Sequence, residues 1–294
     1  MSDNDTIDYE LWHYTPSLAG GIIASIAFAL LTIAHTWRLA RTRLWFCIPF
    51  VIGGLFETIG YAARATAHAS TASLAPYIIQ SVLILLAPIL FAASIYMILA
   101  RLIRACSGGG HGDGGGGGEA YSLVRVTWLT KIFVGGDVFC FLVQGAGASM
   151  LARAENQAAY DRGEKIVLGG LVLQIVVFGV FVVVAGVWHW RMKKGKNGVV
   201  VVAAGDDGGK WAWQRFMWVL YGVSGLVAVR NVARCVEYGT GRNSFLISHE
   251  WCLYVYDFML MFAALAASLY WYALPMGQQR NQLPGGRDAE MTPY

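Results

Sequence analysis

Charged residues are scarce in this chain of 294 residues. Asp, Glu, Lys and Arg make up 14% of the sequence, whereas a soluble globular domain carries about 25%. Hydrophobic residues make up 56% of the chain, and its mean hydropathy is +0.51. This composition argues against a soluble domain and favours an integral membrane protein.

Motifs of several enzyme and cofactor classes are also missing. The chain has no GxxxxGK[ST] phosphate loop, no HExxH or HxxxH zinc motif and no GxSxG nucleophile elbow. Its last hydrophobic stretch has no lysine that could hold retinal as a Schiff base. His35 and His189 lie at the ends of hydrophobic stretches, and we interpret His35 as a membrane-interface histidine rather than a metal ligand. We therefore expect no enzymatic activity, no metal and no cofactor.

The sequence has instead seven long hydrophobic windows. Each can cross a bilayer as a helix, because about 20 residues span the hydrocarbon layer. The windows are residues 17–37, 44–66, 76–103, 123–150, 166–190, 211–236 and 248–274. We predict an all-α, polytopic membrane protein, in which residues 17–275 form a bundle of seven transmembrane helices.

Basic residues alternate between the connections and predict the orientation. The connections after the first, third and fifth windows are rich in Lys and Arg, and the N-terminal tail has neither. Because cytoplasmic loops carry an excess of these residues, we predict an N-terminus outside and a cytoplasmic C-terminus. The acidic start, MSDNDTIDYE, is unlike a cleavable signal peptide, and the sequon at Asn4 fits an outside position. The net charge of +4 reflects the inside bias and does not indicate a nucleic-acid partner.

Polar and glycine-rich segments flank the helical domain. Residues 1–16 are predicted to be an extracellular tail, and residues 276–294 a disordered cytoplasmic tail. The glycine-rich segment 105–120 and the basic segment 191–210 are predicted to be flexible cytoplasmic connectors.

Small residues, proline and cysteine occur inside the windows. We interpret Pro88 and four glycines as helix-packing features, since small residues let membrane helices approach closely; the glycines are Gly135, Gly136, Gly145 and Gly147. None of the five cysteines forms a CxxC motif. Cys235 and Cys252 fall near the predicted outer face, where they form either a disulfide or two small buried side chains.

Ionisable residues recur on three helical faces at the predicted outer end of the bundle. The spacing i, i+4, i+7 places each set on one face, and the sets are Glu57, Tyr61, Arg64; Arg230, Arg234, Glu237; and Glu250, Tyr254, Asp257. Four further polar residues lie in other windows: Gln80 and Gln174 in the outer half of theirs, and Asp137 and Gln144, spaced i and i+7, in the fourth window.

A charge at the bilayer centre costs about 2.5–3.5 kcal/mol, so these side chains are expected to face inward and pair. Four acids meet three arginines at similar depth, which predicts an outward-opening polar pocket laced by ion pairs. Ion pairs that only fix helix packing, or arginines that snorkel to the headgroups, are the alternative. Asp137 lies deeper, with Lys131 too far for a close pair, and we expect it to be functional.

Several segments together resemble the fungal RTA-like family of lipid-translocating exporters, named for resistance to aminocholesterol. The resemblance covers residues 14–275 and includes FETIGYAAR, GGDVFCFLVQGAG, RNVARCVEYGTG and HEWCLYVYDFMLM. Family residues carry over onto Glu57, Gly60, Tyr61, Arg64, Gln80, Pro88, Asp137, Gln144, Gly145, Gln174, Arg230, Arg234, Glu237, Glu250 and Asp257.

This resemblance implies a fungal membrane protein associated with resistance to toxic amphiphiles such as aminosterols and sphingoid bases. We therefore expect a plasma-membrane transporter or exporter whose partners are membrane lipids and an amphiphilic small molecule. The alternative is a seven-helix receptor or regulator of lipid asymmetry without net transport. An intramembrane hydrolase is disfavoured because its metal ligands are missing, and the sequence does not give the oligomeric state.

Overall fold

The computed structural model describes residues 17–68, 74–106, 122, 125–152, 156–194, 209–240 and 250–273. Within these ranges the chain is all-α, and seven helical segments are long and apolar enough to cross a membrane. The predicted seven-helix bundle is therefore confirmed. Both predicted tails, the sequon at Asn4 and most of the connectors at 105–120 and 191–210 lie outside the described residues.

The first six spans are regular α-helices apart from one short 3-10 turn. They are α1 (Leu18–Thr42), α2 (Ile48–Ala67) preceded by the 3-10 turn η1 (Trp45–Cys47), α3 (Leu74–Ala105), α4 (Val126–Ala152), α5 (Gln157–Lys194) and α6 (Gly209–Gly239). The seventh span is composite: α8 (Glu250–Leu253), the π-helix η3 (Tyr254–Met259), α9 (Leu260–Ser268) and the 3-10 turn η4 (Leu269–Ala273).

A tight connection sets α2 antiparallel to α1. Arg43 adopts a left-handed conformation (φ 52°), and its N–H donates to the Leu39 carbonyl at 2.8 Å, which closes the last turn of α1. Proline in the first turn of α2 then restarts the helix, because its missing N–H needs no partner there. At the other end of α1, the Ser17 hydroxyl caps the helix by accepting from the Gly20 N–H at 3.2 Å.

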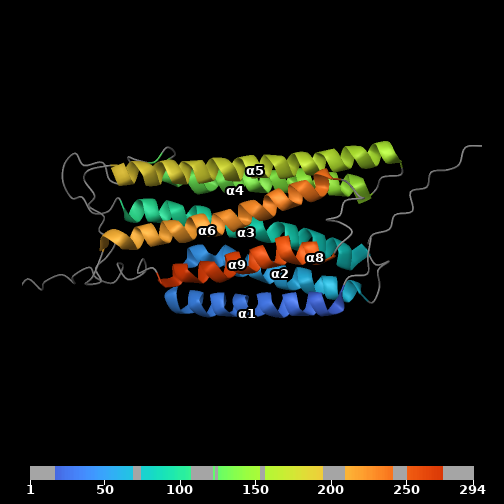
Figure 1. Cartoon of the computed structure of the whole chain (residues 1–294), viewed down its shortest axis with the longest axis horizontal. Helices are drawn as coiled ribbons and strands as arrows, with labels where there is room; N and C mark the ends of the chain where they lie inside the picture. The colour runs from blue at the N-terminus through green and yellow to red at the C-terminus, as the bar shows by residue number, and fades with distance from the viewer. Residues whose placement is uncertain are drawn as a thin grey trace, which may run out of the picture.

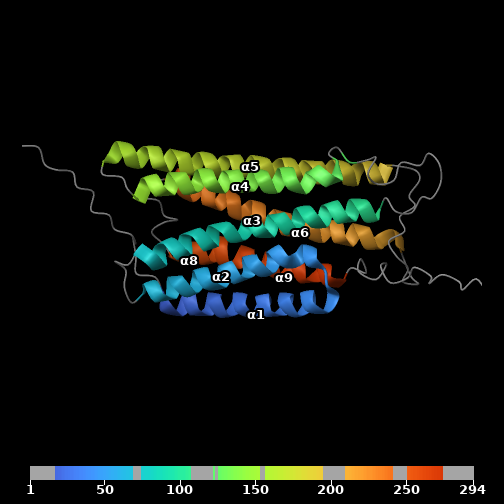
Figure 2. The same cartoon turned by 180° about the vertical axis from the view of Figure 1, so that it is seen from behind.

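The helices lie side by side with their long axes roughly aligned (Figures 1 and 2). In both views α4 and α5 form one side of the bundle, α3 and α6 the middle, and α1, α2, α8 and α9 the other side. The helices α2 and α6 finish, and α8 begins, at the same end of the bundle, on the right in Figure 1. We call this end the Glu250 end.

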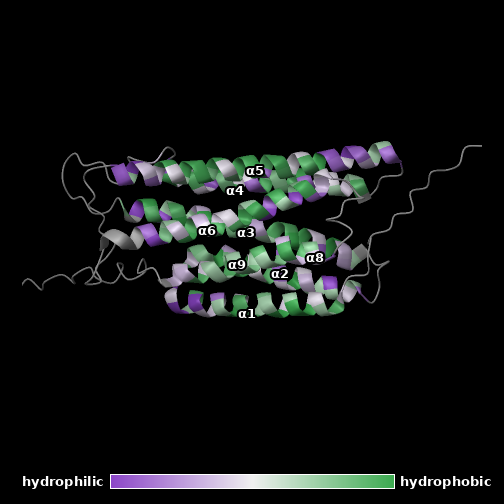
Figure 3. Ribbon diagram, in the orientation of Figure 1, coloured by the Kyte–Doolittle hydropathy of each residue, from purple (hydrophilic) through white to green (hydrophobic). Residues whose placement is uncertain are grey.

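The outer surface of the bundle is apolar, as a lipid-facing surface must be. Figure 3 shows hydrophobic residues along the middle of the helices and hydrophilic residues gathered toward the two ends of α5. Large apolar side chains face outward, among them Leu30 (64% exposed) and Val183 (62%). The interior is filled by aliphatic and aromatic side chains, and among these Phe28, Tyr96 and Phe181 are fully buried.

The fifth helix is longer than its hydrophobic window. The window at 166–190 predicted a helix of ordinary length, but α5 has 38 residues, or about 57 Å at 1.5 Å per residue. Its first turns carry charged residues such as Asp161 and Arg162, and Asn156 caps them by accepting from the Ala159 N–H at 2.9 Å. Hydropathy marks the part of a helix that meets lipid, so a polar extension lies outside the window.

The packing role predicted for the small residues fits two of the four glycines in α4. A Cβ on Gly147 would lie 2.8 Å from the Val167 backbone nitrogen, and one on Gly136 would lie 3.0 Å from Val177 Cγ1. Gly135 and Gly145 face open space instead. Helix α3 runs on through Pro88, whose side chain is buried.

Candidate functional site

Two arginines of α6 bind one carboxylate of the π-helix at the Glu250 end. Arg230 Nε donates to Asp257 Oδ1 at 2.7 Å, and Arg234 donates to Asp257 Oδ2 at 3.0 Å. Arg230 also donates to the Ile84 carbonyl of α3 at 3.1 Å. Arg234 makes a second ion pair with Glu237 at 3.0 Å, one turn further along α6. These contacts join α6, η3 and α3 through a single set of charges.

The π-helix places Asp257 in this set. The hydrogen bonds of a π-helix join residues five apart, one more than in an α-helix, and such segments are frequent at functional sites. Here it spans Tyr254–Met259 and carries Asp257, which is only 1% exposed. The i, i+4, i+7 spacing predicted an α-helix throughout this window, and the π-helix at Tyr254–Met259 was not foreseen from the sequence.

A fourth ion pair lies nearer the helix ends. Arg64 donates to Glu250 Oε1 at 2.9 Å, which links α2 to α8. The Ser17 N–H donates to both carboxylate oxygens of Glu250, at 2.9 and 3.1 Å, so the start of α1 joins the same group. The ring of Tyr254 stacks on the ring of Tyr61, with the ring centroids 6.3 Å apart.

Glu57 is buried inside the cluster but bonded to nothing that the structure describes. Its side chain is 0% exposed, and neither carboxylate oxygen has a hydrogen-bond partner among the described residues. The Tyr61 hydroxyl, one turn away on α2, is likewise buried and without such a partner. Phe28 of α1 stacks on Tyr61 at 5.6 Å and closes the cluster on that side.

The three sets of residues predicted from the i, i+4, i+7 spacing therefore come together. We call this group the charged cluster; it comprises Glu57, Tyr61, Arg64, Arg230, Arg234, Glu237, Glu250, Tyr254 and Asp257. Its central members are closed off from solvent, since Glu57, Arg64, Arg230 and Asp257 are each at most 1% exposed. The predicted outward-opening pocket and its contact with a ligand stay predictions.

Asp137 does not join the charged cluster. It lies on α4 and accepts a hydrogen bond from the Tyr96 hydroxyl of α3 at 2.7 Å, among Phe133, Phe178 and Phe181 packed around Tyr96. Its other oxygen, Oδ1, has no partner among the described residues. Lys131 is exposed and stands over the Trp128 ring, so the loose pairing considered for it is absent from the described contacts. Sequence spacing gave no sign of Tyr96 as the partner.

Two of the three glutamines bond each other, and the third lies elsewhere. Gln144 Nε2 of α4 donates to Gln174 Oε1 of α5 at 2.9 Å, so these two form a buried link between neighbouring helices. Gln80 of α3 is buried, and its carbonyl oxygen has no partner among the described residues. Their predicted place in one pocket with Glu57 is not tested by these contacts.

His35 is a core residue, so its interpretation as an interface histidine was wrong. It is fully buried, with Nδ1 3.2 Å from the Tyr272 hydroxyl and Nε2 2.9 Å from the Leu265 carbonyl. The reason is its position on the inward face of α1, which the end of the hydrophobic window did not reveal. The cysteines are free thiols, Cys235 and Cys252 included; Cys252 is buried, as the second reading of that pair expected, whereas Cys235 is half-buried.

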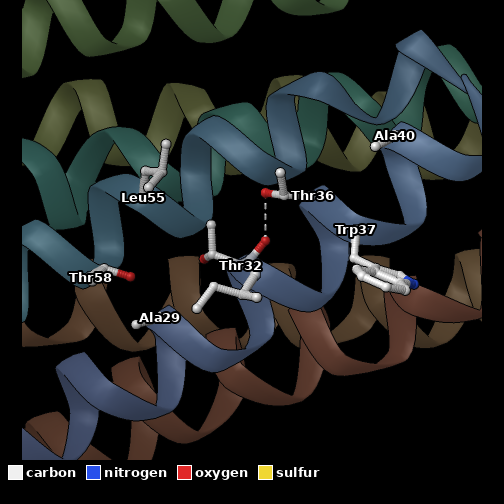
Figure 4. A pocket seen from close by; sticks show the side chains of 8 residues that line it. Ala29, Thr32, Thr36, Trp37, Ala40, Leu55 and Thr58 are labelled. Carbon is white, nitrogen blue, oxygen red and sulfur yellow. Dashed lines mark hydrogen bonds between the residues drawn. The ribbon is translucent and has the colours of Figure 1, made fainter.

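A groove of about 400 Å³ lies elsewhere, on the outer face of α1 and α2 (Figure 4). It is lined by Ala29, Thr32, Ile33, Thr36, Trp37, Ala40, Leu55 and Thr58. The three threonine hydroxyls are satisfied within their own helices; Thr36, for example, donates to the Thr32 carbonyl at 2.8 Å. The groove is therefore an apolar recess facing lipid and holds none of the predicted site residues.

Comparison with known proteins gives one family. The family model described as RTA1 like protein matches residues 50–277. Protein RTM1 of Saccharomyces cerevisiae is 33% identical over 68% of this chain and 59% of its own length. Protoporphyrin uptake protein 1 of the same yeast is 31% identical over 69% of the chain and 61% of its own length.

A more distant relative is the Probable lipid transporter atnI of Emericella nidulans, 28% identical over 86% of this chain and 64% of its own length. The chain thus spans about three fifths of the length of these relatives. No solved structure matches it. With a seven-helix membrane bundle and a family match over most of its length, the chain belongs to the RTA1-like family of fungal integral membrane proteins.

Proposed function

We propose that this protein moves an amphiphilic lipid across the membrane and that the charged cluster receives the polar head group of that lipid. Two relatives support the general activity by their names, a probable lipid transporter and a protoporphyrin uptake protein. The activity is transport and not catalysis. The N-terminus lies outside, the C-terminus in the cytoplasm, and the membrane is the plasma membrane.

The observation that carries the proposal is the Glu57 carboxyl group, which lies inside a cluster of ion pairs and has no partner among the described residues. Helix packing alone is served by pairs such as Arg230 with Asp257. It gains nothing from a fourth acid without a partner, because a buried unpaired charge is costly. An acid in excess over arginines suits a ligand that brings its own positive charge. A sphingoid base or another long-chain amine has such a head group, and its chain would lie between the helices.

Flux of a fluorescent long-chain amine in reconstituted vesicles tests the proposal. Glu57→Gln keeps the shape of the side chain and breaks no described ion pair. We expect it to slow flux by about tenfold or more, since a hydrogen bond to a charged group contributes about 1.5–3 kcal/mol. Lys165→Gln is the matched control, an exposed charge on α5 outside the charged cluster, and should transport normally. Equal flux with both variants and wild type would refute a role for the cluster.

A lipid-sensing receptor or regulator is the second candidate, and the closed packing of the cluster favours it. Arg64, Arg230 and Asp257 are each 1% exposed, so a head group enters only if helices separate. Such a movement serves sensing as well as transport. Saturable binding of the amine to purified protein, with no flux in vesicles that hold the same protein, would favour the receptor.

A further inference from the structure

The formal charges of the cluster do not balance, and the imbalance falls on one residue. The cluster holds four carboxyl groups and three guanidinium groups. Arg64 pairs with Glu250, Arg230 with Asp257, and Arg234 with both Asp257 and Glu237. Three acids and three bases thus neutralise one another. Glu57 is the acid left over, and its ionised form would give a buried site a net charge of one.

The described bases near Glu57 already pair with other acids. Arg230 and Arg234 of α6 face Glu57, but both form ion pairs with Asp257 of the π-helix. Asp257 also faces Glu57, and it is itself an acid. Tyr61 lies one turn further along α2, and its hydroxyl carries no charge. The neighbouring elements α1 and α3 contribute the apolar side chains Phe28 and Ile84 beside Tyr61 and Gly60.

A carboxylate that is 0% exposed, and whose two oxygens accept no hydrogen bond from the part of the chain that the structure describes, is too costly to keep charged in such a place. Two species can remove the cost. A proton converts the group to the neutral acid, and a cation bound between its oxygens compensates the charge. Since both species occupy the same two oxygens, they exclude each other.

We infer that Glu57 is an exchange site, which holds a proton when the cluster is empty and the ammonium head group of an amphiphile when it is loaded. This inference rests on the proposed function and adds that lipid transport is coupled to the movement of a proton. On loading, the O–H bond of the Glu57 carboxylic acid breaks, its proton leaves to solvent, and the carboxylate pairs with the R–NH₃⁺ group. The net charge of the cluster is zero before and after. One proton therefore moves against each cationic lipid, and a proton gradient drives transport.

Infrared spectroscopy of the purified full-length protein tests the ligand-free half. At neutral pH the wild type should show a carbonyl band of a protonated carboxylic acid, and this band should be missing from Glu57→Gln. Asp137→Asn is the matched control, because Asp137 is a second buried carboxyl in a separate place, bonded to Tyr96. It should keep the Glu57 band. If wild type and Glu57→Gln give the same carbonyl spectrum, Glu57 holds no proton and the inference is overturned.

Sphingosine, a single-chain primary amine, tests the exchange itself. Its binding should abolish the Glu57 band and release about one proton for each molecule bound, read from calorimetry in buffers of different ionisation enthalpy. N-acetylated sphingosine has no ammonium group and should release none. Sphingosine bound with the band intact and no proton released would refute the exchange and leave the proposed function standing. A Glu57 band without any binding of sphingosine would refute the proposed function for amines, and the exchange with it.

Discussion

The Arg230 guanidinium and the Asp257 carboxylate lie 2.7 Å apart, and both side chains are 1% exposed. This ion pair connects α6 to the π-helix at a depth where neither charge reaches solvent. A buried pair contributes little net stability compared with apolar residues of the same shape, but the loss of one partner strands the other charge. Arg230 and Glu57 belong to one cluster but differ in what a mutation would do. Arg230 depends on its ion pair with Asp257, whereas Glu57 has no ion pair among the described residues that could be lost.

Neutralising Asp257 should destabilise the protein strongly. Asp257→Asn leaves Arg230 and Arg234 without their shared carboxylate, and the loss of one partner of a buried pair costs about 3–5 kcal/mol. We expect a clear fall in the melting temperature of purified protein, measured by the thermal loss of the monodisperse chromatographic peak.

Glu237→Gln is the control for Asp257→Asn. Glu237 is 13% exposed, and its described ion pair is with Arg234 on its own helix, so its removal should cost about 0.2–1 kcal/mol, as for more exposed pairs. Equal melting temperatures for the two variants would contradict the view that burial sets the cost.

Glu57→Gln should leave stability unchanged or raise it. The glutamine replaces a group that has no described hydrogen bond, and it cannot become charged. If the same melting assay shows a loss as large as that of Asp257→Asn, then Glu57 has an ionic partner in the folded protein, contrary to the structure.

Tyr96→Phe should destabilise the contact between α3 and α4. The substitution removes the donor to Asp137, and a buried acceptor left unsatisfied costs about 1–3 kcal/mol. The combined variant Tyr96→Phe with Asp137→Asn should lose less than the sum of the two single variants. Tyr61→Phe is the matched control, since the Tyr61 hydroxyl bonds nothing described. Additive losses in the double variant would mean that the two side chains do not interact.

A methyl group on Gly147 should separate α4 from α5. The new Cβ would meet two backbone atoms, the Val167 nitrogen at 2.8 Å and the Gly163 carbonyl oxygen at 2.9 Å, which cannot rotate away. Overpacking of this kind costs about 1–3 kcal/mol. Gly145→Ala on the same helix faces open space and should be neutral or stabilising by up to about 1 kcal/mol. Loss of folded protein with Gly145→Ala alone would reverse this assignment.

The Glu250 end of the bundle should face outside the cell. Ala158→Cys stands on the exposed first turn of α5 at that end, and Lys194→Cys stands on its exposed last turn. A membrane-impermeant maleimide should label Ala158→Cys in intact cells and Lys194→Cys only after permeabilisation. Both cysteine variants are made in a chain that also carries Cys235→Ser, which removes the native cysteine most open to the reagent, because the other described cysteines are buried. Labelling in the opposite order would invert the predicted topology.

The hydrophobic windows and the repeated spacing of charges were enough to predict much of the fold and part of the candidate site. Seven windows gave seven helices because crossing a bilayer demands a run of apolar residues whatever the neighbours are. The spacing in FETIGYAAR and RNVARCVEY placed each set of charges on one helical face. Membrane burial of charge then required those faces to meet, as Arg64 with Glu250 and Arg230 with Asp257 do.

The tertiary structure alone decided which polar groups share a neighbour. Asp137 is a buried acid like Asp257 of the charged cluster, yet α4 packs beside α3 and α5, and the partner of Asp137 is Tyr96. The π-helix at Tyr254–Met259 and the burial of His35 likewise followed from packing. Local spacing fixes the direction of a side chain on its own helix. The partner it meets, and whether Glu57 meets any, depends on how helices distant in the chain are placed around it.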